Sequence, residues 1–374
     1  MTDNVHDHVD ILVIGAGQAG LAIAHLLNES GVRFTVLEGQ SRIGDSWRQR
    51  YDSLVLFSSR AFSALPDFPL NGDPAGYPDK SEIADYLERY ARVTRLPIEL
   101  NERVTALEQT DRGFTTRTAS GRQITATCVI VAAGPFQRAI VPLFARQLAI
   151  DVQQFDGTTF RNSHQLPLGR ILVAGDGPTG RQISVELAPT HQVWLSAGSL
   201  RLVVPQRFFG RDIIGWFETT GALRDDKESL HGRFVQLFDP IPGWHLRRSA
   251  LRRAGVKIVP RAIDAVDQTI TFAGGQSQDF DAVIWAIGYQ DDSSWLRIPG
   301  AVDAKGNYVE QRGISPVPGL FHIGRSWQNN RASALLTGVG NDAREIAAQA
   351  VEFVRAQTAA PNGQRRARFL SKRG

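Results

Sequence analysis

Two glycine-rich segments of this sequence share one spacing, and this repetition restricts the possible folds more than any other feature. Residues 10–20 read DILVIGAGQAG and residues 170–180 read RILVAGDGPTG. Each loop follows a short apolar run, typical of a buried parallel strand, and precedes a stretch with helical periodicity. A strand, a glycine loop and a helix in this order predict a dinucleotide-binding unit, because N–H groups at the helix N-terminus can bind a pyrophosphate. The repeated glycines are Gly15, Gly17 and Gly20 in the first loop and Gly175, Gly177 and Gly180 in the second.

The first unit continues as this interpretation requires. The helical stretch LAIAHLLNE ends at Gly31, and a second strand, Phe34 to Leu37, ends at Glu38, 23 residues after Gly15. A carboxylate at this position can accept hydrogen bonds from ribose hydroxyls. Together with the loop residue Gln18, the first unit therefore predicts a site for a dinucleotide whose ribose hydroxyls are free.

The second unit differs after its second strand. The segment VWLSAGSLR ends without an acid and offers Ser196, Ser199 and Arg201 instead. A carboxylate would repel a ribose 2′-phosphate, whereas an arginine pairs with one. The second site, with Pro178 and Thr179 in its loop, is therefore predicted to bind NADPH, and the pair of sites suggests hydride transfer from NADPH to FAD. Arg207 is an alternative phosphate ligand, and an arginine without a ligand-binding role is a further interpretation of Arg201.

The rest of the chain indicates how the two units are connected. A helix is expected over residues 81–93 with Ser81 as its cap, and residues 98–131 alternate in short runs as hairpin strands do. The sequence closes with a strand, a loop and a long amphipathic helix. We expect a discontinuous FAD-binding domain at residues 1–160 and 287–360. An inserted NADPH-binding domain would occupy 161–286, with a helical cover of the active site at about 208–253. Residues 361–374 would form a basic disordered tail.

Composition excludes several classes of protein. The net charge of +4 arises in the last 14 residues, which hold five cations. Without those five, the chain has 37 basic and 38 acidic residues. This favours a solvated tail over a nucleic-acid or membrane arm. Cys128 is the only cysteine, so no internal disulfide or thiolate metal cluster can form. No signal peptide or membrane-spanning run is evident, and we expect a cytoplasmic enzyme.

Three further segments accompany the two loops. They are GDSWRQRYDSLVLFSSR after the first unit, VIVAAGPF, and VIWAIGY ahead of GLFHIGRSW. Together the motifs resemble class B flavoprotein monooxygenases, particularly the compact flavin-containing and YUCCA-type enzymes, over about residues 8–355. The resemblance implies an α/β fold with two Rossmann-like dinucleotide-binding domains of the glutathione-reductase type, the second inserted into the first. It also implies that reduced FAD reacts with O₂ to give a C4a-peroxide, which transfers one oxygen atom to a substrate.

The resemblance also implies roles for particular residues. The helix entered around Ser333 would direct its N-terminus at the flavin, where the helix dipole favours the anionic reduced form. Ser58 or Ser59 would stand beside the reacting oxygen, although a loop cap explains either serine equally well. Besides the first loop and Glu38, the FAD ligands would be Gln40, Gly44, Trp47, Arg48, Val104, Gly134 and Gly324, and Gly288 would contact NADP.

One family motif is altered here. The linker signature F-x-G-x-x-x-H begins at Phe155 and Gly157, but Arg161 replaces the histidine and His164 follows three residues later. His164 is either a displaced linker histidine or an ordinary loop residue. No metal cluster or acid–base pair is apparent, and chemistry supplied by a flavin requires neither.

These observations favour an NADPH-dependent FAD monooxygenase that oxygenates a small molecule at nitrogen, sulfur or a carbonyl carbon. The alternatives are an NADPH-dependent flavin oxidoreductase or oxidase and a flavin-binding sensor. The expected partners are a small-molecule substrate and O₂, without nucleic acid, and a homodimer is possible. Aromatic residues of the cover line an apolar substrate channel, pack as core or form a membrane-facing patch; they are Phe208, Phe209, Trp216, Phe217, Phe234 and Trp244.

Overall fold

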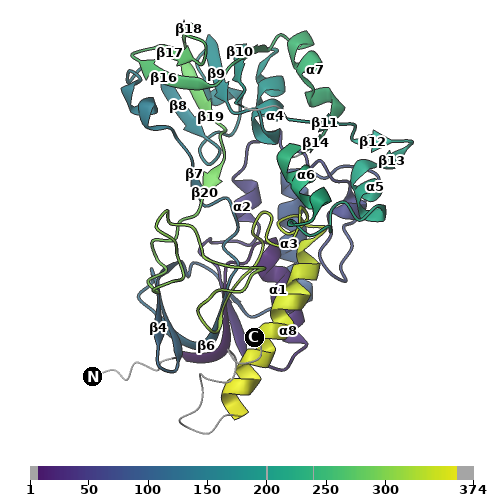
Figure 1. Cartoon of the computed structure of the whole chain (residues 1–374), viewed down its shortest axis with the longest axis vertical. Coiled ribbons are helices and arrows are strands. Elements are labelled where there is room, and N and C mark those ends of the chain that lie inside the picture. The colour runs from purple at the N-terminus through teal and green to yellow at the C-terminus, as the bar shows by residue number, and fades with distance from the viewer. Residues whose placement is uncertain (1–6, 199–200, 239, 360–374) are drawn as a thin grey trace.

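A computed structural model describes residues 7–198, 201–238 and 240–359. Two sheets form two lobes, which are joined by the short antiparallel pair β7 and β20 (Figure 1). The expected basic tail at 361–374 and Ser199 lie outside the described residues. The connecting strands are β7 (Arg138–Ala139) and β20 (Tyr289–Gln290).

The first sheet has the strand order β3-β2-β1-β6-β5-β4, with β21 paired to β6. Strands β1, β2, β3, β6 and β21 are parallel neighbours, whereas β4, β5 and β6 form an antiparallel meander. The hairpins expected over 98–131 are therefore present, except that β3 joins β2 in parallel. The bounds are β1 (Asp7–Ile14), β2 (Phe34–Leu37), β3 (Ile98–Glu99), β4 (Val104–Thr110), β5 (Gly113–Thr118), β6 (Gln123–Val131) and β21 (Leu320–His322).

Helices cover one face of this sheet, and α1 packs along α8 in the lower lobe of Figure 1. Their apolar faces share one buried core in which Leu21, Leu27 and Ala350 are fully enclosed. Helix α3 is capped by Asp79, one residue before its start, and not by Ser81: the Asp79 carboxylate accepts from the N–H groups of Ser81 and Glu82, both at 2.8 Å. The helices are α1 (Gln18–Asn28), α2 (Asp45–Arg48), η1 (Arg60–Phe62), α3 (Lys80–Val93) and α8 (Val339–Ala359).

The second sheet is parallel throughout, in the order β15-β10-β9-β19-β8. Strand β8 lies in the range expected for the first domain, yet it pairs with β19 in this sheet. The three-stranded antiparallel sheet β16-β17-β18 belongs to the same upper lobe (Figure 1). The elements are β8 (Gln153–Asp156), β9 (Arg170–Ala174), β10 (Gln192–Ser196), β15 (Lys257–Val259), β16 (Ala262–Val266), β17 (Thr269–Phe272), β18 (Ser277–Asp279), β19 (Ala282–Trp285), η2 (Leu143–Gln147), η3 (Ser163–Gln165), α4 (Pro178–Leu187) and α7 (Arg248–Arg253).

The cover, expected at 208–253, is from here on the segment between β10 and α7, residues 201–246 without residue 239, and it is only partly helical. It contacts the first lobe in several places: Ile214 and Leu223 pack with Ala332, and Lys227 donates from Nζ to the carbonyl of Gln328 at 2.8 Å. The cover therefore bridges the two lobes. Its elements are β11 (Val203–Val204), β12 (Arg207–Phe208), β13 (Arg211–Asp212), α5 (Ile213–Thr219), α6 (Leu230–Phe238), β14 (Ile241–Pro242) and η4 (Trp244–Leu246).

The aromatic residues of the cover have two different environments. Trp216 and Phe217 pack against the apolar cluster around Ile214, whereas Phe209 is 85% exposed. Phe208, Phe234 and Trp244 are also exposed. Within residues 7–198, 201–238 and 240–359, no helix combines the length and apolar character that crossing a membrane requires.

Candidate dinucleotide-binding sites

The first glycine loop, residues 15–20 with the N-terminus of α1, is here called the first cradle. Gly15 has a φ of +104°, and a Cβ on Gly20 would lie 1.8 Å from the carbonyl oxygen of Gly15. Neither position tolerates a side chain, because the backbone of the turn and the backbone of the helix are in direct contact there. A Cβ on Gly17 would instead meet nothing within 4 Å, and no side chain caps the N-terminus of α1. The N–H groups of this helix end can therefore bind an anion.

The second cradle, residues 175–180 with the N-terminus of α4, repeats this geometry. Gly175 has a φ of +107°, and a Cβ on Gly180 would again lie 1.8 Å from the carbonyl oxygen of the first glycine. Gly177 again has nothing within 4 Å of a built Cβ, and α4 has no side-chain cap. Both sheets therefore present the same glycine loop before a helix N-terminus without a side-chain cap.

The repetition extends to a third strand of each sheet, where the sequence indicated Gly134 and Gly288 separately but not the match between them. A Cβ on Gly15 would meet the carbonyl of Ala132 after β6, and one on Gly175 would meet that of Ala286 after β19. Two residues beyond these alanines, Gly134 and Gly288 have φ values of +70° and +105°. The sequence pattern A-x-G after a buried strand, present at 132–134 and 286–288, was the available signal.

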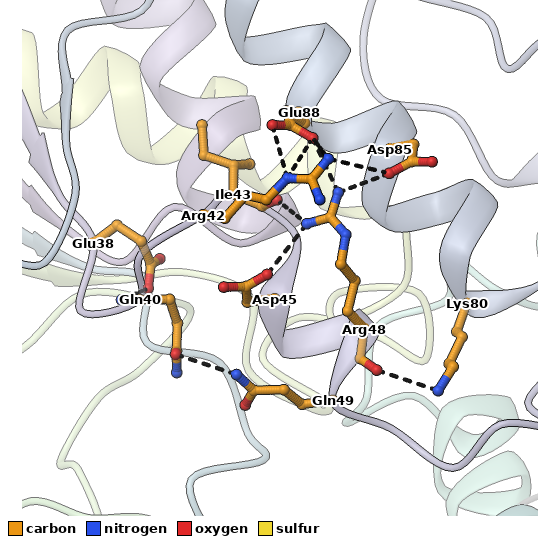
Figure 2. A network of polar contacts seen from close by, with 10 residues as sticks. All are labelled: Glu38, Gln40, Arg42, Ile43, Asp45, Arg48, Gln49, Lys80, Asp85 and Glu88. Carbon is orange, nitrogen blue, oxygen red and sulfur yellow. Dashed lines mark hydrogen bonds and ion pairs between the residues drawn. The ribbon is translucent and has the colours of Figure 1, made fainter. Parts of the chain in front are cut away.

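Glu38 is fixed beside the first cradle by two backbone groups. Its Oε2 accepts from the N–H of Ala16 at 2.7 Å, and its Oε1 accepts from the N–H of Gln40 at 2.9 Å. Figure 2 shows Glu38, the first residue after β2, next to Gln40. Each carboxylate oxygen keeps a further lone pair, so the group can still accept from ribose hydroxyls.

The register of the loops identifies the counterpart of Glu38. The N–H of Gly15 donates to the carbonyl of Leu37, and the N–H of Gly175 donates to that of Ser196. Ser196 therefore matches Leu37, and Ala197 matches Glu38. The buried Ser196 hydroxyl accepts from the N–H of Ala262 at 2.9 Å and donates to the carbonyl of Pro260 at 3.1 Å. This geometry contradicts the expected contact of Ser196 with a ribose phosphate, because its hydroxyl is directed into the lobe.

An arginine that the sequence did not single out lies at this edge of the second cradle. A Cβ on Gly198 would lie 2.9 Å from Nε and 3.0 Å from Nη2 of Arg261, whose side chain is exposed. Arg207, the alternative phosphate ligand, is engaged elsewhere: it donates to the carbonyl of Ala75 and lies over the ring of Tyr77 at 5.6 Å. Arg201 is half-buried near Arg181 and adds to the positive charge there.

A loop of the first lobe reaches the second cradle. Tyr51 is buried, and its hydroxyl donates to Oε1 of Gln182 in α4 and lies beside Thr179. Burial raises the pKa of the Tyr51 phenol, which therefore stays protonated. Pro178 is the first residue of α4 and has no N–H to offer.

Several residues expected at the flavin converge on the N-terminus of α1. The Trp47 indole donates to Oε1 of Gln18, and Nε2 of Gln18 donates to the carbonyl of Ala334, both at 3.4 Å. A Cβ on Gly324 would lie 2.5 Å from the Cβ of Ala19 in the first turn of the helix. The segment after β21 therefore closes over the first cradle, as a site for an extended dinucleotide requires.

Arg48 has a different environment from the expected one. Figure 2 shows its guanidinium directed at carboxylates: Nη1 lies 3.3 Å from Asp45, and Nη2 lies 2.7 Å from Asp85 and 3.0 Å from Glu88. Arg42 pairs with Glu88 at 2.6 Å. These groups, here called the rim network, connect the loop before α2 to α3. Arg48 is thus a structural residue of the rim.

Gly44 and Gln40 lie in the same loop. Gly44 has a φ of +87°, and its built Cβ would lie 2.6 Å from the carbonyl of Ala84, so the loop presses on α3. The side-chain oxygen of Gln40 accepts from Nε2 of Gln49 at 3.4 Å. Val104 begins β4 and is half-buried against the apolar cluster on the far face of the sheet.

Ser333 and Ser58 both serve local structure. The buried Ser333 hydroxyl accepts from the N–H groups of Asn329 and Asn330 at 3.0 and 3.1 Å, and α8 begins at Val339, not near Ser333. Ser58 Oγ lies 2.8 Å from Oγ of Ser63, and this contact fits the interpretation as a loop cap. In each case the hydroxyl is held by a nearby turn of the backbone, and the spacing of residues in the sequence does not reveal such a turn.

The altered linker signature packs against the connection between the lobes. A Cβ on Gly157 would lie 2.1 Å from the Tyr289 hydroxyl, and the Gln165 side chain accepts from the N–H of Arg161. His164 is exposed in η3. The described residues contain no group of three or more metal-binding side chains. His322 is fully buried, and burial lowers its pKa to about 3, so it is neutral near pH 7.

Comparisons with known proteins agree with this geometry. Residues 12–195 match the family described as pyridine nucleotide-disulphide oxidoreductase. A CzcO-like uncharacterised oxidoreductase of Geobacillus kaustophilus is 43% identical over 339 residues, which are 90% of this chain and 97% of the relative. Indole-3-pyruvate monooxygenase YUCCA8 of Oryza sativa is 27% identical over 408 residues, covering 94% of this chain and 93% of the relative.

The structure of a flavin-containing monooxygenase from Stenotrophomonas maltophilia matches with a TM-score of 0.78 and 26% identity, covering 93% of this chain and 99% of that one. The chain therefore belongs to the CzcO-like oxidoreductases. It is an oxidoreductase with the expected α/β fold of two Rossmann-like dinucleotide-binding domains.

Proposed function

We propose that this oxidoreductase is an NADPH-dependent FAD monooxygenase acting on a small organic molecule at nitrogen, sulfur or a carbonyl carbon. NADPH and a proton supply two electrons and two protons; one atom of O₂ enters the substrate and the other leaves as water. The observation that carries the proposal is the contrast at the ribose positions of two otherwise matching cradles. Glu38 stands at the first, whereas Ala197 and the nearby Arg261 stand at the second.

The residues of the first cradle fit FAD. The uncapped α1 N-terminus would bind the pyrophosphate, and Glu38 would accept from the ribose of the adenosine half. Trp47, Gln18 and Gly324 would enclose the part of the molecule that runs past the helix. Bound FAD would supply the hydride acceptance and the reaction with O₂ that this chemistry requires.

The second cradle fits NADPH better than NADH. Its α4 N-terminus can bind a pyrophosphate, and Ala197 leaves the ribose position free of a carboxylate. The exposed Arg261 guanidinium can donate two parallel hydrogen bonds to the 2′-phosphate of NADPH. NADH has an uncharged 2′-hydroxyl at that position, which an arginine attracts much less.

The cover supplies an apolar surface beside the first lobe. Ile214 and Leu223 pack with Ala332, next to Phe57 and Phe62 of the loop that contains Ser58. Asp212 fixes this contact, because its Oδ2 accepts from the N–H of Ser59 at 3.0 Å while its Oδ1 caps α5. Such a surface would exclude water from the reacting groups and favour a substrate with apolar bulk.

The relatives support an oxygenase on two sides. Both the YUCCA8 protein and the S. maltophilia protein are described as monooxygenases, and each spans nearly the whole chain.

A second function has its own support. The linker lacks the histidine of the signature, with Arg161 in its place, and the G. kaustophilus relative at 43% identity is described only as an oxidoreductase. Under this alternative the enzyme passes electrons from NADPH to a partner or to O₂ without oxygenating a substrate.

Isotope labelling separates the two functions. The flavin-loaded protein is supplied with NADPH under ¹⁸O₂ and a panel of amines, thioethers and ketones, and the products are examined by mass spectrometry. The proposal expects one labelled oxygen atom per NADPH consumed with at least one class. If every class of compound gave peroxide in an amount equal to the NADPH consumed, and no product carried the label, the protein would be an oxidase and not a monooxygenase.

A further inference from the structure

We propose that Arg248 is a phosphate-binding residue of the second cradle, and that the Asp176–Arg248 pair adjusts this cradle for a nucleotide that must leave after each turnover. The proposal rests on the proposed function, because it requires a nicotinamide nucleotide at this loop. It adds a residue from the start of α7, far from both glycine motifs in the sequence.

The matched glycines align the other residues of the two loops. Asp176 stands where the first cradle has Ala16, Pro178 where it has Gln18, and Arg181 where it has Leu21. Pro178 removes one N–H from the helix end, and Asp176 adds a negative charge. With these two differences alone, the second cradle should therefore bind a pyrophosphate less tightly than the first.

Arg181 neutralises much of the Asp176 charge inside the lobe. Both side chains are almost fully buried, and Nη2 of Arg181 lies 3.2 Å from Oδ2 of Asp176. Arg181 also donates from Nε to the Asp176 carbonyl at 2.8 Å and from Nη1 to the carbonyl of Leu246 at 2.7 Å. The last bond connects the end of the cover to the nucleotide loop and fixes the start of α7 there.

Arg248 begins α7 two residues after Leu246 and approaches the same carboxylate. Its Nη2 lies 3.6 Å from Oδ2 of Asp176, and its side chain is 39% exposed. At this distance the pair is an ion pair without a short hydrogen bond, so the guanidinium retains donors for an anion. Arg201 adds to the positive charge around Arg181.

The arrangement predicts opposing effects on a bound nucleotide. Arg248 attracts the phosphates and replaces the N–H that Pro178 lacks, whereas Asp176 competes for Arg248 and repels the same phosphates. The first cradle has the neutral Ala16 and Leu21 at the matching positions. A resident dinucleotide and an exchanging one thus acquire different affinities on the same backbone.

Calorimetric titration of the flavin-loaded protein with NADP⁺ tests the inference. Arg248→Gln should weaken binding by about 10-fold, since one charge-assisted contact is lost and Asp176 is less screened. Asp176→Asn should tighten binding by about 5-fold while its amide oxygen still accepts from Arg181. Arg252→Gln, an exposed arginine on the same helix, is the matched control and should change nothing.

The outcomes separate this inference from the proposed function. If the wild type does not bind NADP⁺, the proposed function fails. If the wild type binds and Arg248→Gln binds as tightly, the role of Arg248 is wrong. Should Asp176→Asn unfold, Arg248→Gln still decides, because it leaves the buried Asp176–Arg181 pair intact. Raising the salt concentration should weaken NADP⁺ binding less in Arg248→Gln than in the wild type; equal salt dependence would contradict the contact.

Discussion

The first and second cradles follow the same backbone path and differ in the side chains around it. Gly15 and Gly175 have φ values of +104° and +107°, and Gly17 and Gly177 share a φ of −72°. At the ribose position, however, the first cradle has Glu38 and the second has Ala197. The comparison teaches that the glycines set a common backbone path, and under the proposed function the groups on neighbouring strands and helices select the nucleotide. Each prediction below alters one cradle and uses the other as reference.

The third glycine of each loop should give the largest effects. A Cβ on Gly20 or Gly180 would lie 1.8 Å from a carbonyl oxygen, and overpacking against backbone costs about 3 kcal/mol or more. Gly20→Ala should therefore give protein without flavin. Gly180→Ala should keep flavin and lose reduction by NADPH by about 100-fold, measured by rapid mixing.

The control for this pair is the second glycine of each loop. Gly17→Ala and Gly177→Ala place the Cβ in open space and should leave folding intact. If Gly180→Ala lost flavin while Gly20→Ala retained it, the assignment of the two cradles would be reversed.

Arg261 should determine coenzyme preference. Arg261→Gln should lower the ratio of kcat/KM for NADPH to that for NADH by about 10-fold, because a charged contact with the 2′-phosphate is lost. Arg207→Gln, which removes the guanidinium over Tyr77, should leave this ratio unchanged. A ratio that responds to Arg207 and not to Arg261 would place the phosphate elsewhere.

Tyr51 tests the contact that the first lobe makes with the second cradle. Tyr51→Phe removes the hydrogen bond to Gln182 and should lower the free energy of unfolding by about 1 kcal/mol. The KM for NADPH should rise a few-fold with kcat little changed. Because the pKa of this phenol is raised, Tyr51 stays protonated from neutral to mildly alkaline pH. Its titration should therefore not change the wild-type KM over this range. A fall in kcat with constant KM would instead give Tyr51 a role in the reaction.

The rim network should give the smallest effect. The hydrogen bond from Arg42 lowers the pKa of Glu88. A lowered folded pKa gives stability that is present above the ordinary value of about 4.3 and is lost as the pH falls through the folded one. Glu88→Gln should lower the free energy of unfolding by less than about 1 kcal/mol, because these side chains are partly exposed.

Thermal unfolding at several pH values measures this contribution. The difference in Tm between wild type and Glu88→Gln should be largest near neutrality and should shrink on acidification. A difference that grows at low pH would contradict the assigned ion pairs. Flavin content should stay equal in both proteins, since the network supports the rim of the first cradle and does not line it.

The sequence predicted those parts of the fold that depend on local backbone requirements. Glycine spacing located both cradles, because Gly15 and Gly20 stand where any Cβ would clash with backbone. The end of β2 placed Glu38 correctly beside its loop. Both features lie within about 25 residues of sequence, so turn and strand rules suffice for them.

Side-chain directions set by distant partners could not be predicted in this way. Ser196 is directed into the lobe by the backbone of residues 260–262, and Arg48 is drawn to carboxylates on α3. Arg261 is remote from Gly198 in the sequence. The two residues meet because β15 and β10 are paired in parallel, and each residue follows the end of its strand by two positions.

The central claim is that FAD occupies the first cradle and a 2′-phosphorylated nicotinamide nucleotide reaches it from the second. Anaerobic rapid mixing of the purified protein with NADPH or with NADH, followed by the visible absorbance of flavin, tests this claim most directly. The account predicts a yellow protein that is bleached by both coenzymes and at least about 10-fold faster by NADPH at equal low concentration. Colourless protein that does not take up FAD, or equal rates with the two coenzymes, would contradict it.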